Sequence, residues 1–207
     1  MKTEIYTEDD LSQIVDIIKH EGIVAFPTET VFGLGIRYDS LPAIRKLKSA
    51  KQRPETKPFP MMVGSVEQIE QVAVLTERDR LLISRWMPGP ITMIFKKKGT
   101  VPAEVTNGFE TIALRMPDNA FVLSVINGVG VPLLVPSANI TTQPPALNYQ
   151  EVLDQLDGRI DGVVIGTCRN NISSTILNTL EPELTIVREG PISLEAIKMS
   201  LKETANG

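Results

Sequence analysis

Two kinds of hydrophobic pattern alternate along the chain. Residues 23–26 and 131–135 are short, continuous apolar runs, as expected for strands that are buried on both faces. Residues 11–18 instead place apolar side chains at helical spacing after an acidic first turn, which predicts an amphipathic helix that ends near residues 20–22. Because runs of the two kinds follow one another, we expect a twisted mixed α/β sheet flanked by helices.

The same patterns predict the remaining elements. Further helices are expected at residues 40–47, 66–72, 76–87, 117–126 and 149–156 and from residue 193 onward. Further strands are expected at residues 59–63, 91–97, 111–116, 162–165, 174–177 and 184–188. No clean doubly wound order follows from this pattern, since neighbouring strands late in the chain could pair antiparallel. The chain shows no repeat or linker, so we expect one domain over residues 1–207.

The segment at residues 22–35 reads as a strand that leads into a binding loop. Pro27 ends the apolar run, because proline has no N–H to donate to a sheet. The polar residues 28–30 follow at the carboxyl end of the strand, where open α/β sheets place ligands. Gly33 and Gly35 would let the backbone approach a neighbour closely. The alternative is a polar turn between two core elements.

A basic segment at residues 45–57 stands out in a chain whose net charge is −4. A negative net charge argues against a protein that coats nucleic acid non-specifically, although a local basic patch can still bind an anionic ligand. Lys51, Arg53 and Lys57 are predicted to lie beyond the preceding helix, where prolines restrict the backbone. Fixed cations in a rigid loop are suited to binding a polyphosphate. The alternative is that the basic segment is only a run of solvent-exposed charges.

Small polar or cationic residues recur where other predicted strands begin or end. They are Thr111 and Arg115 in one strand, Ser137 and Asn139 after another, and Ser174 before a third. Serine, threonine and asparagine are also ordinary turn residues, so each one alone is better explained by structure. Their shared placement is what favours a binding site.

The residues that the chain lacks restrict its chemistry. His20 is the only histidine and Cys168 the only cysteine, and Cys168 is expected to lie far from the other candidates. A Ser-His-Asp or Cys-His centre or a histidine-rich metal site is therefore unexpected. Neither the P-loop nor the dinucleotide-binding glycine pattern occurs. The remaining site type uses cations, hydroxyls and backbone amides to position reactants and neutralise phosphate charge.

The sequence also indicates the cellular compartment of the protein. A single cysteine allows no internal disulfide, which fits a reducing environment. The first ten residues lack the basic start and apolar centre of a signal peptide. No apolar run approaches the length of a membrane span. We therefore expect a cytoplasmic protein without a membrane partner.

Taken together and in order, the motifs of this chain resemble those of the YrdC-like family of threonylcarbamoyl-AMP synthases. The resemblance covers nearly the whole chain, and it is the ordered set that is specific. The motifs are Pro27-Thr-Glu-Thr-Val-Phe-Gly-Leu-Gly35, Lys51-Gln-Arg53 with Lys57-Pro58, Pro88-Gly-Pro-Ile-Thr92, Arg115-Met-Pro117, Pro136-Ser-Ala-Asn139, Ser174-Thr-Ile176 and Arg188-Glu-Gly190.

The resemblance implies a nucleotidyltransferase that joins L-threonine, bicarbonate and ATP into threonylcarbamoyl-AMP and releases pyrophosphate. The product would supply the threonylcarbamoyl group for a tRNA processing step, the modification of the adenosine beside the anticodon. Downstream threonylcarbamoyl-transferase proteins would transfer this group to the tRNA. Mg²⁺ would enter with the ATP phosphates, and no separate protein metal site is expected. The implied fold is YrdC-like, similar to dihydroxybutanone-phosphate synthase, with an open, positively charged concave cavity.

The resemblance also implies roles for single residues. Lys51 and Arg53 would be the catalytic cations. The ATP site would comprise Lys51, Arg53, Lys57, Thr111, Ser137, Asn139 and Arg188. The threonine site would comprise Thr30, Arg115, the backbone near Val135, and Ser174. Arg115 suits a carboxylate, because its guanidinium can bind two oxygens at once.

The chain departs from the family pattern at several positions. Phe32 stands where tyrosine is common, and Met62 stands where a histidine often follows the basic motif. These changes bear on amino-acid specificity and rate more than on the fold. Longer family members carry a further C-terminal domain, which this chain is expected to lack.

A second hypothesis belongs to another functional class. The same basic cavity could bind double-stranded RNA or tRNA without catalysis, and salt-sensitive RNA binding that persists without ATP or threonine would mark this case. Thr30, Arg115 and Ser174 favour the enzyme, because an RNA-binding module needs no amino-acid pocket. A related carbamoyl-adenylate synthase would need partner domains that this chain is not expected to have.

Overall fold

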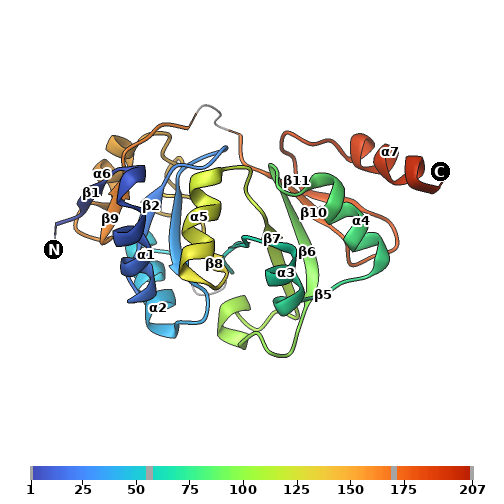
Figure 1. The fold of residues 1–207 in the computed structure, drawn as a ribbon, viewed down its shortest axis with the longest axis horizontal. Helices are drawn as coiled ribbons and strands as arrows, with labels where there is room; N and C mark the ends of the chain where they lie inside the picture. The colour runs from blue at the N-terminus through green and yellow to red at the C-terminus, as the bar shows by residue number, and fades with distance from the viewer. Residues whose placement is uncertain (1, 55–57, 169–171, 206–207) are drawn as a thin grey trace.

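Helices and strands alternate along the chain in the computed structural model, which describes residues 2–54, 58–168 and 172–205 (Figure 1). The helices are α1 (Leu11–Lys19), α2 (Leu41–Lys51), α3 (Val66–Val72), α4 (Glu77–Trp86), α5 (Ala120–Val129), α6 (Tyr149–Leu156) and α7 (Leu194–Ala205). The strands are β1 (Glu4–Tyr6), β2 (Val24–Phe26), β3 (Gly33–Arg37), β4 (Met61–Met62), β5 (Ala73–Val74), β6 (Ile91–Lys97), β7 (Thr111–Arg115), β8 (Leu133–Leu134), β9 (Gly162–Val164), β10 (Thr175–Asn178) and β11 (Thr185–Arg188).

The described strands form one mixed sheet in the order β1-β9-β2-β3-β8-β4-β7-β6-β10-β11, with β5 paired to β6 beside this path. Parallel pairs such as β6 with β10 lie next to antiparallel pairs such as β6 with β7 and β10 with β11. The predicted mixed α/β sheet is therefore confirmed. The late antiparallel pair explains why no doubly wound order could be read from the alternation of elements.

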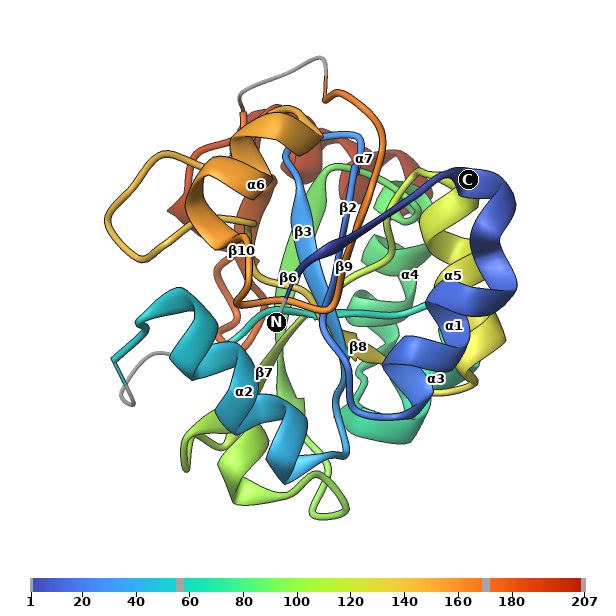
Figure 2. The same ribbon diagram turned by 90° about the vertical axis from the view of Figure 1, so that its left-hand side faces the viewer.

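Helices cover both faces of the sheet. Figure 2 shows α1 and α5 on one side of the strands, with α2 and α6 on the other. Strand β2 shows how the sequence specifies this arrangement, because its side chains alternate between the two faces. Val24 and Phe26 pack into the cluster formed with α1 and α5, whereas Ala25 belongs to the larger core that includes residues of α2 and α6. The continuous apolar run is thus a strand buried on both faces.

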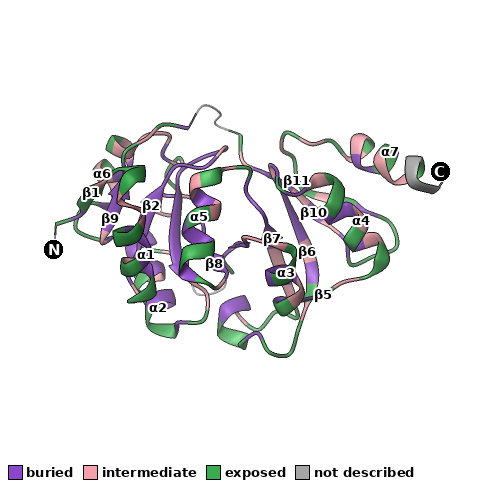
Figure 3. Ribbon diagram, viewed as in Figure 1, coloured by how far each residue is buried: buried purple, intermediate pink, exposed green. Residues whose placement is uncertain are grey.

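Burial is deepest in the central strands and falls toward the two ends of the molecule (Figure 3). Strands β2, β8 and β9 contain only buried residues, whereas most residues of the terminal strands β1 and β11 are exposed. In the part of the chain that the structure describes, no helix combines the length and apolar character required to cross a membrane.

The largest difference from the predicted elements lies just after β2. The binding loop was expected to extend to residue 35, but the chain turns within residues 27–32 and returns as β3, antiparallel to β2. The glycines of β3 serve packing inside the sheet. A Cβ added at Gly35 would lie 2.5 Å from a ring carbon of Phe26, and one at Gly33 would lie 2.5 Å from Val135. The sequence motif therefore contains a strand, a short loop and a second strand.

Other boundaries differ by a few residues. Strands β4 and β8 have two residues each, where runs of five apolar or partly apolar residues predicted longer strands. The short strands β1 and β5 were not predicted. Helix α5 begins at Ala120, because the Asn119 side chain accepts a hydrogen bond from the N–H of Val122 and so caps the helix.

Close packing at Gly35 leads to a testable prediction. The change Gly35→Ala should lower the free energy of unfolding by about 1–3 kcal/mol, because the new methyl group must displace the buried ring of Phe26. Urea unfolding of the two proteins measures the difference. Gly99→Ala is the control, since its Cβ would meet nothing within 4 Å. Equal stability of the Gly35→Ala protein and the original chain would contradict this packing.

Candidate active site

A cavity of about 440 Å³ lies where β4, β6, β7, β8 and β10 and the loop after β2 meet. One face of three neighbouring strands forms part of its lining. Side chains alternate along strands, and the residues that line the cavity include Thr92 and Ile94 of β6, Ala113 and Arg115 of β7, and Ile176 of β10. The intervening residues Met93, Leu114 and Leu177 belong to the hydrophobic core.

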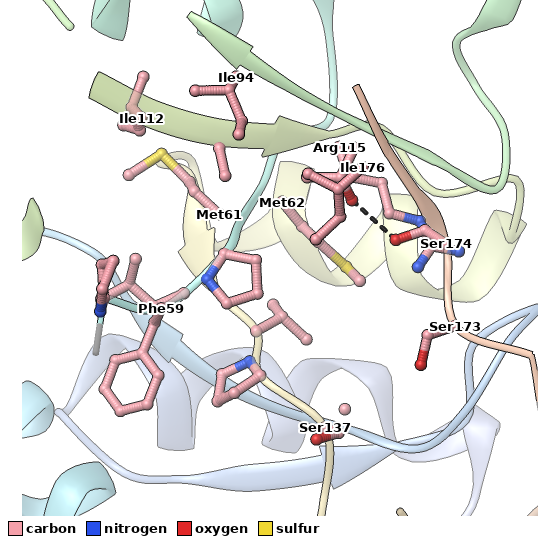
Figure 4. A pocket seen from close by; sticks show the side chains of 18 of the residues that line it. Phe59, Met61, Met62, Ile94, Ile112, Arg115, Ser137, Ser173, Ser174 and Ile176 are labelled. Atoms are coloured by element: carbon pink, nitrogen blue, oxygen red, sulfur yellow. Dashed lines mark hydrogen bonds between the residues drawn. The ribbon is translucent and has the colours of Figure 1, made fainter. Parts of the chain in front are cut away.

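The cavity has an apolar end and a polar end (Figure 4). Phe59, Met61 and Ile112 lie on one side of the view, and Arg115 and Ser174 lie on the other. An aromatic or aliphatic group of a ligand can therefore be covered at one end while an anionic group is bound at the other. This division was not expected from the sequence, where only the polar residues had been considered.

The loop between β2 and β3 is held by its own hydroxyl groups. The Thr28 hydroxyl donates to the carbonyl of Val31 at 2.7 Å and accepts from the N–H of Thr30 at 3.1 Å. The side-chain oxygens of Thr28 and Thr30 lie 3.0 Å apart. Both residues are buried and line the cavity. These bonds fix Thr30 with its hydroxyl toward Arg115.

Arg115 is the central charged residue of the polar end, and it is only 5% exposed. It donates from Nη1 to the Thr30 hydroxyl at 3.1 Å, and its Nη2 lies 2.7 Å from Oε1 of Glu29. The same carboxylate oxygen accepts a hydrogen bond from the N–H of Asp118 at 2.8 Å. The Nε and Nη2 of Arg115 make no hydrogen bond among the described residues, although Nη2 forms the ion pair with Glu29. Both nitrogens are buried, and Arg115 itself lines the cavity.

Ser174 and Arg188 are in direct contact on the other wall of the polar end. Arg188 donates from Nε and Nη2 to the Ser174 carbonyl at 3.1 and 2.7 Å, and from Nη2 to the Ser174 hydroxyl at 3.0 Å. The Ser174 and Thr92 hydroxyl oxygens lie 2.8 Å apart. Burial, together with the positive charge of Arg115, lowers the pKa of Arg188. The two guanidinium groups are therefore close enough to interact.

Lys51 is placed differently from the prediction. It was expected in a loop beyond the helix, but it is the last residue of α2 and is 1% exposed. Its ammonium group donates to the carbonyl oxygens of Ser137 and Asn139 and to Oδ1 of Asn139. Burial and the nearby charge of Arg53 lower the pKa of Lys51 to about 7. The side chain therefore joins the end of α2 to the loop after β8.

That loop also contains a second internal support. The Ser137 hydroxyl donates to Oδ1 of Asn139 at 2.6 Å, and Nδ2 of Asn139 donates to the carbonyls of Ile140 and Gln143, each at 2.8 Å. Only Ser137 of this group lines the cavity. Asn139 and Lys51 lie behind it and fix its position.

Arg53 lies at the edge of the cavity beside the apolar end. Its Nη2 donates to the Pro58 carbonyl at 2.9 Å, and its guanidinium carbon lies 5.0 Å from the centre of the Phe59 ring. Burial lowers the pKa of Arg53. The contact with Phe59 positions a cation next to the apolar wall.

The structure thus brings most of the predicted site residues together. Those that line the cavity are Thr30, Arg53, Thr111, Arg115, Val135, Ser137, Ser174 and Arg188. Lys51 and Asn139 are adjacent to the cavity but do not line it, and Lys57 lies outside the described residues. Met62 also lines the cavity, so this departure from the family pattern faces the ligand space.

Several residues of the site were missed or misplaced in the sequence analysis. Thr92 ends the motif at residues 88–92, but it had been interpreted as part of a strand without a role. Glu29 had no assigned partner, and the contact with Arg115 depends on tertiary structure that no local pattern reveals.

His20 lies at the end of α1, where its ring forms a hydrogen bond with the Asp16 carbonyl, as expected for a helix-terminal residue.

The prediction for Cys168 was wrong in one respect. Burial raises the pKa of its thiol, which also lies beside the backbone of Thr28 and within the influence of the Glu29 carboxylate. Cys168 is therefore close to the loop of residues 27–32 and not far from the other candidates. Its N–H donates to the Leu147 carbonyl at 2.6 Å.

Sequence comparison finds a matching protein family and named relatives of this chain. Residues 16–190 match the family model Sua5_yciO_yrdC, described as "Telomere recombination". A threonylcarbamoyl-AMP synthase of Enterobacter sp. (strain 638) is 37% identical over 166 residues, which cover 78% of this chain and 86% of that protein. The enzyme of the same name from Bacillus subtilis (strain 168) is 34% identical over 199 residues, which cover 94% of this chain.

Solved structures show the same fold. The structure of P. abyssi Sua5 complexed with L-threonine matches 97% of this chain and 62% of its own with a TM-score of 0.92 and 32% identity. E. coli YciO matches 94% of this chain and 99% of its own with a TM-score of 0.86. At 20% identity, the likeness to YciO shows the fold alone.

The lengths of the relatives differ. The chain spans 58% of the length of the B. subtilis protein and 55% of that of the Pyrococcus abyssi (strain GE5 / Orsay) synthase. It nevertheless matches the family model over most of its residues, and the fold agrees with the predicted YrdC-like sheet. The chain belongs to the Sua5/YciO/YrdC family.

Proposed function

We propose that this protein is a nucleotidyltransferase that makes threonylcarbamoyl-AMP from L-threonine, bicarbonate and ATP, with release of pyrophosphate. The observation that carries the proposal is the single cavity that brings Thr30, Arg115 and Ser174 together with Thr111, Ser137 and Arg188. These residues come from distant parts of the sequence. Relatives named threonylcarbamoyl-AMP synthase at 34–37% identity support the same function.

The polar end of the cavity is proposed to bind threonine. Arg115 lines the cavity, and its guanidinium group would receive the carboxylate, since Nε and Nη2 make no hydrogen bond among the described residues. Ser174 and the backbone near Val135 would contact the rest of the amino acid. The P. abyssi relative was solved in complex with L-threonine, which supports this choice of ligand.

ATP is proposed to lie across the cavity toward its apolar end. The adenine base would be covered by side chains such as Phe59 and Ile112. The sugar and phosphates would be contacted by four residues that line the cavity, which are Arg53, Thr111, Ser137 and Arg188. Lys57 is proposed as a further phosphate ligand from outside the described residues.

The proposed chemistry needs no nucleophilic side chain. Threonine and bicarbonate form a carbamate, whose oxygen attacks the α-phosphorus of ATP while pyrophosphate leaves. Fixed arginines and hydroxyls hold the reactants in line and stabilise the charge that develops on the phosphate. Such a site contributes by positioning and electrostatics, which matches the groups that line the cavity.

Mg²⁺ is proposed to enter as part of the ATP complex. Among the described residues, no group of three or more His, Cys, Asp or Glu side chains could hold a metal ion. The polar lining consists mainly of arginines and hydroxyls, which suit phosphate oxygens better than a bare cation. When bound through the phosphates, Mg²⁺ would screen their negative charge.

The wider setting follows from the proposed reaction. The product would pass to threonylcarbamoyl-transferase proteins that modify adenosine in tRNA. We propose that the protein acts in the cytoplasm, where ATP and tRNA are present. Residues 1–207 are proposed to act as one YrdC-like domain.

The function is tested by a product assay. The protein is incubated with ATP, Mg²⁺, ¹⁴C-labelled bicarbonate and L-threonine, and the expected products are labelled adenylate and pyrophosphate. Omission of threonine should abolish both, because the carbamate needs its amine. If the complete mixture yields neither product while the folded protein is verified, the proposed function is wrong.

Lys51 is proposed to act on the nucleotide through the loop after β8. Its ammonium group already meets the oxygens of Ser137 and Asn139, so direct contact with a phosphate would require it to leave them. Loss of Lys51 should therefore disturb Ser137, which lines the cavity. Direct contact between Lys51 and the ATP phosphates during catalysis stays a prediction.

The burial of Lys51 predicts a pH dependence of stability. Its pKa is lowered from 10.5 to about 7 in the folded protein, so the unfolded chain binds more protons between these values. The free energy of unfolding should therefore rise with pH across this window, by at most about 1.4 kcal/mol per pH unit. Lys51→Met removes the titrating group and should remove this contribution.

Urea unfolding at several pH values between 7 and 10 measures the effect. The difference in unfolding free energy between the original protein and Lys51→Met should grow as the pH rises. The difference between the two proteins isolates Lys51 from other groups that titrate in this range. Parallel pH profiles would show that Lys51 keeps an ordinary pKa in the folded state.

A further inference from the structure

Thr92 is a buried polar residue of the cavity that the proposed threonine and ATP sites do not use. It is 3% exposed, and it lies at the start of β6, where it lines the polar end. Its hydroxyl oxygen lies 2.8 Å from that of Ser174. The hydroxyl is therefore placed among ligand-binding groups without a ligand role of its own.

A count of hydrogen atoms shows that this pair can donate to a ligand. The Ser174 oxygen already accepts a hydrogen bond from Nη2 of Arg188 at 3.0 Å. Only one hydroxyl hydrogen of the pair is used between Ser174 and Thr92, whichever of the two donates. The other hydroxyl hydrogen has no acceptor within the described part of the chain. It is available to an oxygen atom of a ligand.

The local charge favours an anion at this point. Within the described residues, the hydrogen bonds of Arg188 go to Ser174, and burial together with the positive charge of Arg115 lowers the pKa of Arg188. The carboxylate of Glu29 pairs with Arg115. A small oxyanion beside the hydroxyl pair would therefore relieve the repulsion between the two guanidinium groups.

The position of the pair narrows the choice of anion. Ser174 belongs to the proposed threonine site and Arg188 to the proposed ATP site, and the two are in direct contact. The group that is joined first to the amine of threonine and then to the α-phosphorus must lie between these sites. In the proposed reaction, that group comes from bicarbonate.

We propose that Thr92, together with Ser174 and Arg188, forms the subsite that binds bicarbonate and the carbamate made from it. This inference rests on the proposed function. The neutral amine of threonine attacks the bicarbonate carbon, a C–N bond forms, and the hydroxyl group of bicarbonate leaves as water with a proton from the amine. A carbamate oxygen then bonds to the α-phosphorus as the bond to the pyrophosphate oxygen breaks. The Thr92 hydroxyl donates to an oxygen of the bicarbonate and of the carbamate.

The test compares the KM values of the three substrates. Initial rates of pyrophosphate release are measured in CO₂-depleted buffer for the original protein, Thr92→Val and Thr92→Ser. Thr92→Val keeps the shape but loses the hydroxyl, and the KM for bicarbonate should rise about tenfold or more, as expected for a lost hydrogen bond to an anion. The KM values for threonine and ATP should change less than about twofold. Thr92→Ser keeps the hydroxyl and should restore the bicarbonate KM.

Thr179→Val is the matched control. Thr179 is also buried, and its hydroxyl donates to the Ile94 carbonyl at 2.8 Å, but it does not line the cavity. Its bicarbonate KM should stay that of the original protein. If Thr92→Val does not fold, as judged by thermal unfolding, Thr92→Ala removes the same hydroxyl and gives the same readout.

Two results would overturn the subsite. One is an unchanged bicarbonate KM in the folded Thr92→Val or Thr92→Ala protein. The other is a threonine KM that rises as much as the bicarbonate KM, which would assign the Thr92 hydroxyl to the amino acid. An original protein that makes no product refutes the proposed function itself, so the two failures are distinguishable.

Discussion

The polar end of the cavity depends on how the buried charge of Arg115 is balanced. Arg115 is 5% exposed, and a buried guanidinium group is costly unless it is paired and hydrogen-bonded. Glu29 supplies the opposite charge, and Thr30 accepts a hydrogen bond from the other terminal nitrogen. Because Glu29 also accepts from the N–H of Asp118, one carboxylate ties the loop after β2 to the end of β7 and the start of α5. The ion pair therefore fixes the position of both Arg115 and Thr30.

The order of the strands explains why the other ligand groups meet there. Strands β6 and β7 are antiparallel, so the start of β6 with Thr92 lies beside the end of β7 with Arg115, one step beyond the pair formed by Met93 and Leu114. Strand β10 runs parallel to β6, so Ser174 lies at the same edge. A mixed sheet thus gathers residues from strand starts and strand ends at one edge, whereas a purely parallel sheet would gather only strand ends.

Much of the fold could be predicted from the sequence, because long apolar repeats and helix caps are local signals. Helices α3 and α6 and strand β6 have the predicted bounds. Strand β3 was missed, because its glycines suggested a loop, although the packing of Phe26 and Val135 requires them. Strand-end residues such as Ser137 and Ser174 were predicted from their motifs. Glu29, Thr92 and the burial of Lys51 could not be, since each depends on a contact with a residue distant in the sequence.

The central claim is that one cavity holds an amino acid and a nucleotide side by side. Calorimetric titration of L-threonine into the protein saturated with a non-hydrolysable ATP analogue and Mg²⁺ tests it most directly. The account predicts saturable threonine binding in the presence of the nucleotide, and weaker threonine binding with unchanged nucleotide affinity in Arg115→Lys, because lysine keeps the charge but loses the planar pair of donors. Displacement of the analogue by threonine, or threonine binding that ignores the change at Arg115, would contradict it.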